Sequence, residues 1–118
     1  MSSLTELPTQ AEVWLADFGP GLRGEPVGHR PVIVLAPSIQ HSRLVPTVTV
    51  IPLTRRERTY VFRHEVLPSP TNGLVAKSFA QVDQIRSVNT ERLIHYAGYV
   101  DAETWGSVRD LVRVYLDT

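Results

Sequence analysis

The segment from Glu25 to Ala36 constrains the fold of this chain more than any other part of the sequence. A flexible polar loop ends at Gly28, and Pro31 restricts the residue before it to an extended backbone. The run from Pro31 to Ala36 is continuously apolar, which is typical of a strand buried on both faces. The sequence therefore predicts a loop that leads directly into a strand of the core.

Arg30 stands immediately before Pro31, at the start of this predicted strand. Because its backbone is extended, we expect the side chain to project from the mouth of the strand. An arginine keeps its charge in proteins and offers five donors in a fixed fork, a geometry that suits phosphate. A rigidly held cation beside a flexible loop therefore predicts an anion-binding site, with a phosphodiester as the expected ligand.

The size of the chain, 118 residues, leaves room for one hydrophobic core. We expect residues 1–10 to form a flexible N-terminal arm and residues 11–118 a single domain. The lack of cysteine excludes disulfides, thiolate metal sites and cysteine nucleophiles, and it fits a reducing cytoplasm. No apolar run approaches the roughly 20 residues that cross a bilayer, and no signal-peptide pattern is present. We expect a cytoplasmic protein that does not bind a membrane.

The charges are unevenly distributed along the chain. A formal net charge of zero counts against a general nucleic-acid binder. Between residues 23 and 63, however, seven arginines accompany only two glutamates, and the remainder of the chain carries the matching acidic surplus. Such asymmetry indicates a polyanionic partner. A solvated surface with a chance bias explains the charge alone slightly better.

Most of the chain has the pattern of short strands separated by loops rich in glycine and proline. The predicted strands cover residues 11–18, 31–36, 47–53 and 60–67, with one or two more within 74–88. The predicted loops and turns cover residues 19–28, 37–46 and 68–73, and a short helical turn at 90–94 is capped by Asn89 or Thr90.

The C-terminal stretch has a helical period. Its apolar residues recur at spacings of three and four, and Asp101 is a suitable N-cap. The stripe consists of Trp105, Val108, Leu111, Val112 and Tyr115. The sequence therefore predicts a mainly β fold class, a small antiparallel sheet or partly closed barrel, with one helix packed on it.

The common hydrolytic signatures are missing from the sequence. The four histidines are scattered, and neither a metal-ligand spacing nor a phosphate-binding glycine loop nor a nucleophile elbow occurs. We expect no metal and no cofactor. RNA suits such a protein as a substrate, because the 2′-hydroxyl of RNA is itself the nucleophile.

Arg30 and Thr54 remain as the candidate catalytic pair. Thr54 closes the predicted strand 47–53, so pairing of this strand with 31–36 brings the two side chains to one edge of the sheet. A fixed guanidinium supplies electrostatic stabilisation to a phosphorane, and a threonine hydroxyl donates to a phosphate oxygen. The alternatives are an ion pair of Arg30 with Glu25 or Asp17, and a local backbone hydrogen bond of Thr54, which is the safer interpretation of that residue alone.

Several motifs, in order along the chain, resemble the MazF/PemK-type toxin endoribonucleases of type II toxin–antitoxin systems. The resemblance runs from Ala11 to about Leu116. The motifs are Glu12-Val-Trp-Leu-Ala-Asp-Phe18, Gly24-Glu-Pro-Val-Gly-His-Arg-Pro-Val-Ile-Val-Leu35, Val48-Thr-Val-Ile-Pro-Leu-Thr54, Gly73-Leu74, Asp83-Gln-Ile-Arg-Ser-Val88 and Arg92-Leu93.

This resemblance implies an SH3-like or PemK-like twisted antiparallel sheet assembled as a homodimer. It implies sequence-specific, metal-independent cleavage of single-stranded RNA, which leaves a 2′,3′-cyclic phosphate and a 5′-hydroxyl. It also implies neutralisation by a cognate antitoxin, with DNA contacted only indirectly through an antitoxin complex. By position, Arg30 and Thr54 are similar to the catalytic arginine and threonine of the family.

Six further residues are candidates for RNA binding. The resemblance places Glu25 in the loop beside the active site, and Gln84 and Arg86 along the RNA path. His29 is a contact candidate only, because alternation along a strand directs it away from the face of Arg30. Arg55 and Arg56 belong to a basic cluster with Arg58 and Arg63, for which an exposed hairpin without a ligand is an equally good explanation.

Two other functions are weighed against the nuclease. A non-enzymatic dimeric toxin of the same fold, similar to the gyrase poison CcdB, requires a partner-binding helix tip, which Val114–Thr118 does not resemble. An SH3-like adaptor without catalysis leaves the alignment of Arg30 and Thr54 unexplained. RNA cleavage therefore remains the leading hypothesis.

Overall fold

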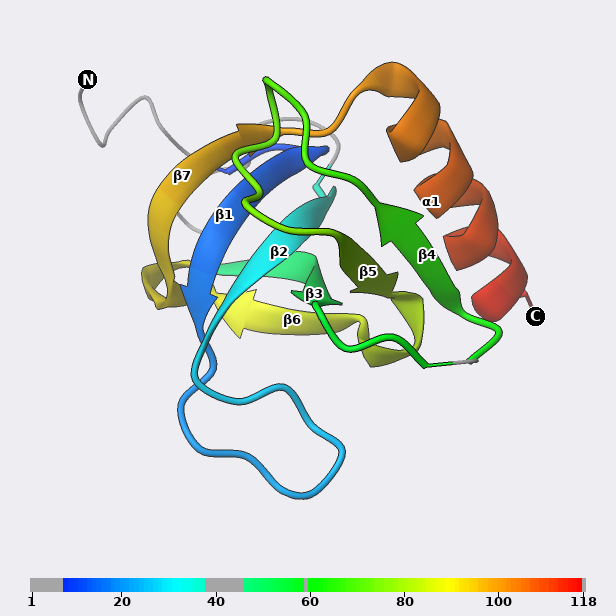
Figure 1. Cartoon of the computed structure of the whole chain (residues 1–118). Helices are drawn as coiled ribbons and strands as arrows, with labels where there is room; N and C mark the ends of the chain where they lie inside the picture. The colour runs from blue at the N-terminus through cyan, green and yellow to red at the C-terminus, as the bar shows by residue number, and fades with distance from the viewer. Residues whose placement is uncertain (1–7, 38–45, 59, 118) are drawn as a thin grey trace.

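The computed structural model describes residues 8–37, 46–58 and 60–117. Within them the chain forms a seven-stranded antiparallel sheet, two short 3-10 turns and one α-helix (Figure 1). The elements are β1 (Glu12–Asp17), β2 (His29–Ala36), β3 (Thr47–Thr54), β4 (Arg63–Val66), β5 (Ser78–Gln81), η2 (Val82–Gln84), β6 (Arg86–Asn89), η3 (Thr90–Arg92), β7 (Leu93–Tyr99) and α1 (Ala102–Tyr115). The predicted fold class, a mainly β chain with a C-terminal helix, is confirmed.

The strands follow the order β4-β5-β3-β2-β1-β7, and β6 pairs with β3 beside this path. One side of β3 pairs with β2, while the other side pairs with β6 near its start and with β5 near its end. Within the described residues the two edge strands, β4 and β7, do not pair, so the sheet stays open. No helix in the described part of the chain is long and apolar enough to cross a membrane.

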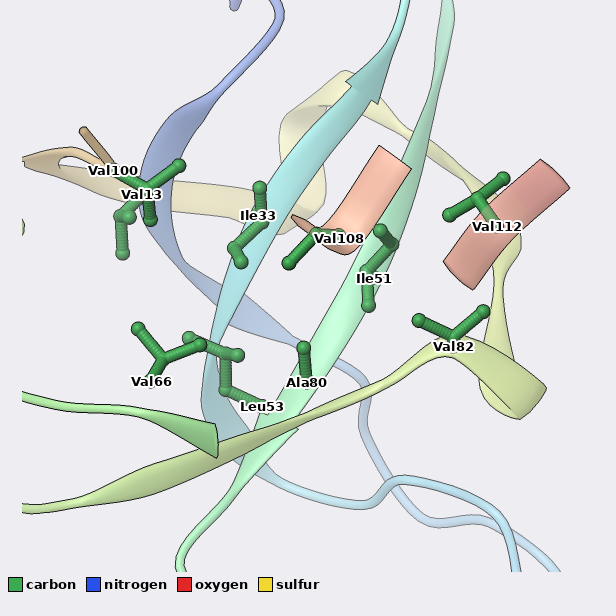
Figure 2. Close-up of a cluster of buried hydrophobic side chains, with 10 residues drawn as sticks. All are labelled: Val13, Ile33, Ile51, Leu53, Val66, Ala80, Val82, Val100, Val108 and Val112. Carbon is green, nitrogen blue, oxygen red and sulfur yellow. The ribbon is translucent and has the colours of Figure 1, made fainter. Parts of the chain in front are cut away.

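The two central strands supply both halves of the core. One cluster packs Ile33 of β2 and Ile51 of β3 against Val108 and Val112 of α1 (Figure 2). The second cluster, on the opposite face, is built around Val32, Val34, Val48 and Val50. Because successive residues of β2 enter different clusters, the prediction of a strand buried on both faces is confirmed.

The helix begins and packs as its period predicts. The Asp101 carboxylate accepts a hydrogen bond from the Thr104 backbone N–H at 2.7 Å, and this bond lowers the pKa of Asp101 below its ordinary value. Trp105 and Leu111 add partly buried surface to the first cluster. At the far end, the Tyr115 ring meets Phe62 edge-on, which ties the last turn of α1 to the segment before β4.

Strand β7 was not predicted. The expected helical turn exists as η3, with the Asn89 side chain accepting from the Glu91 N–H, but it ends at Arg92. Leu93 then begins an edge strand in which most side chains are exposed. An edge strand without a buried face has no period-two pattern, so the sequence contained no signal for it.

A turn at residues 69–74 packs tightly against β7. The Tyr99 N–H donates to the Thr71 carbonyl at 2.8 Å. A β-carbon at Gly98 would lie 2.0 Å from the same carbonyl oxygen, and one at Gly73 would lie 2.3 Å from the Ala97 oxygen. Two glycines therefore permit backbone contact between the turn and the edge strand.

Two predicted segments fall partly outside the described residues. Of the predicted N-terminal arm, residues 1–7 lie outside, while Gln10 donates from Nε2 to the Leu35 carbonyl at 3.0 Å. Of the predicted loop 37–46, residues 38–45 lie outside.

Candidate active site

The pairing of β2 with β3 determines where Arg30 and Thr54 lie. The paired residues include Val32 with Pro52 and Val34 with Val50, and the same register continued by two residues sets Arg30 opposite Thr54. Side chains opposite each other in an antiparallel pair share a face, with β-carbons roughly 5 Å apart. Both residues line one cavity of about 940 Å³. The fold therefore brings a guanidinium and a hydroxyl together.

Arg30 has no ion-pair partner among the described residues. Its Nε donates to the Val27 carbonyl at 3.3 Å. Asp17 instead accepts from the Gly19 N–H, and Glu25 accepts from the Leu22 N–H. The alternative interpretation of Arg30 as half of a salt bridge is therefore wrong, and its terminal nitrogens remain available to an anion.

Thr54 makes the local hydrogen bond that the safer interpretation predicted. Its Oγ1 accepts from the Arg56 backbone N–H at 3.2 Å. A hydroxyl that accepts one hydrogen bond keeps its own hydrogen for donation. The local bond therefore orients Oγ1 and leaves the O–H free to donate into the cavity.

Of the six predicted RNA-binding residues, four line the cavity and two do not. Glu25, His29, Arg55 and Arg56 line the cavity with Arg30 and Thr54. Gln84 in η2 and Arg86 in β6 are not among its lining residues, and the Arg86 guanidinium lies over the Phe18 ring at 5.3 Å.

His29 was predicted as a contact candidate only. It is the first residue of β2 and alternates with Arg30 along the strand, and it also lines the cavity. Its Nε2 is 3.7 Å from Oδ2 of Asp17, its register partner on β1. The imidazole therefore lies near a carboxylate, and both side chains are about half exposed or more.

Arg63 does not belong to an exposed basic cluster. Its side chain is only 8% exposed, and it binds Asp83 through two contacts, Nε to Oδ1 at 2.7 Å and Nη2 to Oδ2 at 3.2 Å. Arg55, Arg56 and Arg58 remain exposed. Of the predicted basic cluster, only these three therefore remain exposed candidates for contact with the RNA backbone.

The lining of the cavity is cationic. Four arginines without a carboxylate partner among the described residues, Arg30, Arg55, Arg56 and Arg58, face a single glutamate, Glu25. Such a surface attracts a polyanion and orients it. Within the described residues no group of three or more histidine, aspartate or glutamate side chains is placed to hold a metal ion.

Tyr60 and Gln81 are among the lining residues that were not singled out from the sequence. Gln81 ends the run Ser78-Phe-Ala-Gln81, in which all four residues are buried. A long polar side chain in a fully buried strand indicates a special role. Because burial is known only from the structure, the sequence alone did not single out Gln81.

Comparison with known proteins identifies what this arrangement resembles. The family model described as PemK-like, MazF-like toxin of type II toxin–antitoxin system matches residues 9–116. Endoribonuclease MazF9 of Mycobacterium tuberculosis (strain ATCC 25618 / H37Rv) is 29% identical over 113 residues, which cover 92% of this chain and 95% of that protein.

Solved structures share the fold. The crystal structure of MazF from Deinococcus radiodurans has a TM-score of 0.79 at 23% identity, covering 96% of this chain and 99% of that one. A mycobacterial endoribonuclease in complex with its cognate antitoxin has a TM-score of 0.71 at 21% identity, covering 92% and 94%.

Proposed function

The chain belongs to the PemK-like, MazF-like toxin family of type II toxin–antitoxin systems, and from that premise we propose that it is an endoribonuclease that cleaves single-stranded RNA. The observation that carries this proposal is the position of Arg30 opposite Thr54 in a cationic cavity. The name of the similar MazF9 protein, an endoribonuclease, supports the same activity.

The reaction needs no nucleophile from the protein. The 2′-oxygen attacks the adjacent phosphorus, the bond from phosphorus to the 5′-oxygen breaks, and a 2′,3′-cyclic phosphate and a 5′-hydroxyl result. The proton lost by the 2′-oxygen is balanced by the proton that the leaving 5′-oxygen gains. The protein therefore has to bind the phosphate, stabilise its added charge and assist proton movement.

The lining residues divide these roles. In this proposal Arg30 donates from its terminal nitrogens to the non-bridging oxygens, and Thr54 donates its hydroxyl hydrogen to the same phosphate. Glu25 and His29 contact the substrate, and Arg55 and Arg56 bind neighbouring phosphates. No step in this scheme requires a metal ion.

Gln84 and Arg86 contact the part of the RNA that extends beyond the cavity. Both residues lie outside the cavity lining, on η2 and β6. A homodimer, neutralisation by a cognate antitoxin, and action in the cytoplasm complete the proposal. The mycobacterial structure with its antitoxin supports the second of these, since its chain shares this fold.

A cleavage assay tests the activity. Purified protein incubated with RNA in EDTA should release discrete fragments that end in 2′,3′-cyclic phosphate, and Arg30→Ala should abolish them. Arg109→Ala, an exposed arginine on α1, is the matched control and should cleave normally. Undiminished cutting by Arg30→Ala would exclude this mechanism. Gyrase inhibition without RNA cleavage would instead support the CcdB-like alternative, which no structural observation favours.

A further inference from the structure

Gln81 presents an unsatisfied polar group at the cavity. The residue is 8% exposed, it ends β5, and it lines the same cavity as Arg30 and Thr54. Its buried amide oxygen Oε1 has no hydrogen-bond partner among the described residues. Buried acceptors are almost always paired in folded proteins, so an oxygen without a protein partner beside a cavity marks a candidate ligand contact.

Strand register places Gln81 close to the phosphate site. Thr54 pairs with Phe79 of β5, and Gln81 follows two residues later on the same face. The Cα atoms of Thr54 and Gln81 are thus separated by one strand and two residues, roughly 8 Å. This separation suits a nucleotide whose phosphate lies at Thr54 and whose base lies at Gln81.

Tyr60 adds an aromatic surface beside Gln81. Its ring lies against the Arg63 guanidinium, with Cζ 4.7 Å from the ring centroid, and Arg63 is the register partner of Gln81. Asp83 holds that guanidinium through two contacts. Tyr60 is 56% exposed and lines the cavity, so a fixed cation supports one part of the ring while much of its surface remains accessible.

We propose that Gln81 and Tyr60 form a base-recognition subsite next to the scissile phosphate, in which Tyr60 stacks on a nucleobase and Gln81 reads its edge. This inference rests on the proposed RNA cleavage. The glutamine amide offers an acceptor and a donor side by side, which complement the N6 amino group and the N7 atom of adenine. Stacking on tyrosine adds affinity for any base. The preferred base at this subsite is therefore adenine.

The test measures base preference separately from activity. Oligoribonucleotides with a single varied base on either side of the cut are cleaved by the wild type and by Gln81→Leu. We expect the wild type to prefer adenine at one of these positions and Gln81→Leu to lose about tenfold or more of that preference. Gln10→Leu, a glutamine that is not among the cavity-lining residues, should keep the wild-type preference.

Two further variants separate recognition from damage to the fold. Gln81→Glu keeps an acceptor and loses the amide donor. It should therefore shift the preference from adenine towards cytosine, because a carboxylate can accept a hydrogen bond from the N4 amino group of cytosine. Tyr60→Ala should weaken binding of every base alike, whereas Tyr60→Phe should not. Binding is followed by fluorescence anisotropy with an oligonucleotide that carries 2′-deoxyribose at the cut and is not cleaved.

The outcomes distinguish this inference from the proposed function. If Gln81→Leu and Gln81→Glu both cleave RNA with unchanged preference at every position, the subsite is wrong and the endoribonuclease stands. If the wild type cleaves no RNA, both are overturned.

Discussion

Arg63 of β4 and Asp83 of η2 form a two-point ion pair across 20 residues of sequence, with the shorter contact at 2.7 Å. The pair connects an edge strand to the turn between β5 and β6. The same turn accepts a hydrogen bond from the Tyr115 hydroxyl through the Asp83 carbonyl at 3.3 Å. One aspartate thus joins the wall of the cavity to the end of α1.

Removal of this carboxylate should destabilise the protein. Asp83→Ala leaves the Arg63 guanidinium largely buried without its partner, so we expect the free energy of unfolding to fall by about 2–3 kcal/mol. Urea denaturation measures the loss. Asp110→Ala removes the exposed pair with Arg113, in which both side chains are more than half exposed, and should cost less than about 0.5 kcal/mol. Equal losses in the two variants would contradict the importance of burial.

The hydroxyl of Thr54 should matter to the rate more than to the fold. Thr54→Val removes the donor to the phosphate while keeping the shape, so kcat should fall about 100-fold or more. Thr54→Ser retains the hydroxyl and should lose far less. Single-turnover cleavage of a defined oligonucleotide measures both rates, and comparable rates for the two variants would remove Thr54 from the mechanism.

Substitution by alanine should have opposite effects on stability at two glycines, Gly98 and Gly106. Gly98→Ala places a β-carbon 2.0 Å from the Thr71 oxygen and should lower the free energy of unfolding by more than about 1 kcal/mol. Gly106, inside α1, has no neighbour within 4 Å of a built β-carbon. Gly106→Ala should therefore raise stability by about 1 kcal/mol through helix propensity. Thermal melts of both variants test the pair, and a destabilised Gly106→Ala would contradict the open environment.

The cap at Asp101 should make stability depend on pH. Hydrogen bonding to Thr104 lowers its folded-state pKa below 3.8, so the unfolded chain binds the proton more readily. The resulting stabilisation is fully present above pH 3.8 and is lost as the pH falls through the lower, folded pKa. Urea titrations of the wild type and Asp101→Asn between pH 2.5 and about 6 should show a difference in stability that shrinks at the acidic end. A difference in stability that does not change with pH would exclude the Asp101 cap as a source of the pH dependence.

Local patterns predicted the parts of the fold whose determinants are close together in sequence. The apolar run after Pro31, the period of α1 and its cap at Asp101 each lie within a few residues, and each was found where expected. The prediction that Arg30 lies near Thr54 required one assumption, that the strands containing them pair. His29, predicted from the sequence as a contact candidate only, also lines the cavity.

The remaining features depend on partners distant in sequence. Strand β7 is an edge strand with most side chains exposed, and its backbone contacts the turn at Thr71. Arg63 resembles its arginine neighbours until Asp83 is brought beside it, and Gln81 becomes notable only because it is buried without a partner. By itself the sequence determined the class of fold and the helix, because propensity and periodicity are local, and it predicted Arg30 as the anion-binding arginine. Only the tertiary structure decided which charges are neutralised and which polar groups remain open to a ligand, because burial and pairing arise when separate segments pack together.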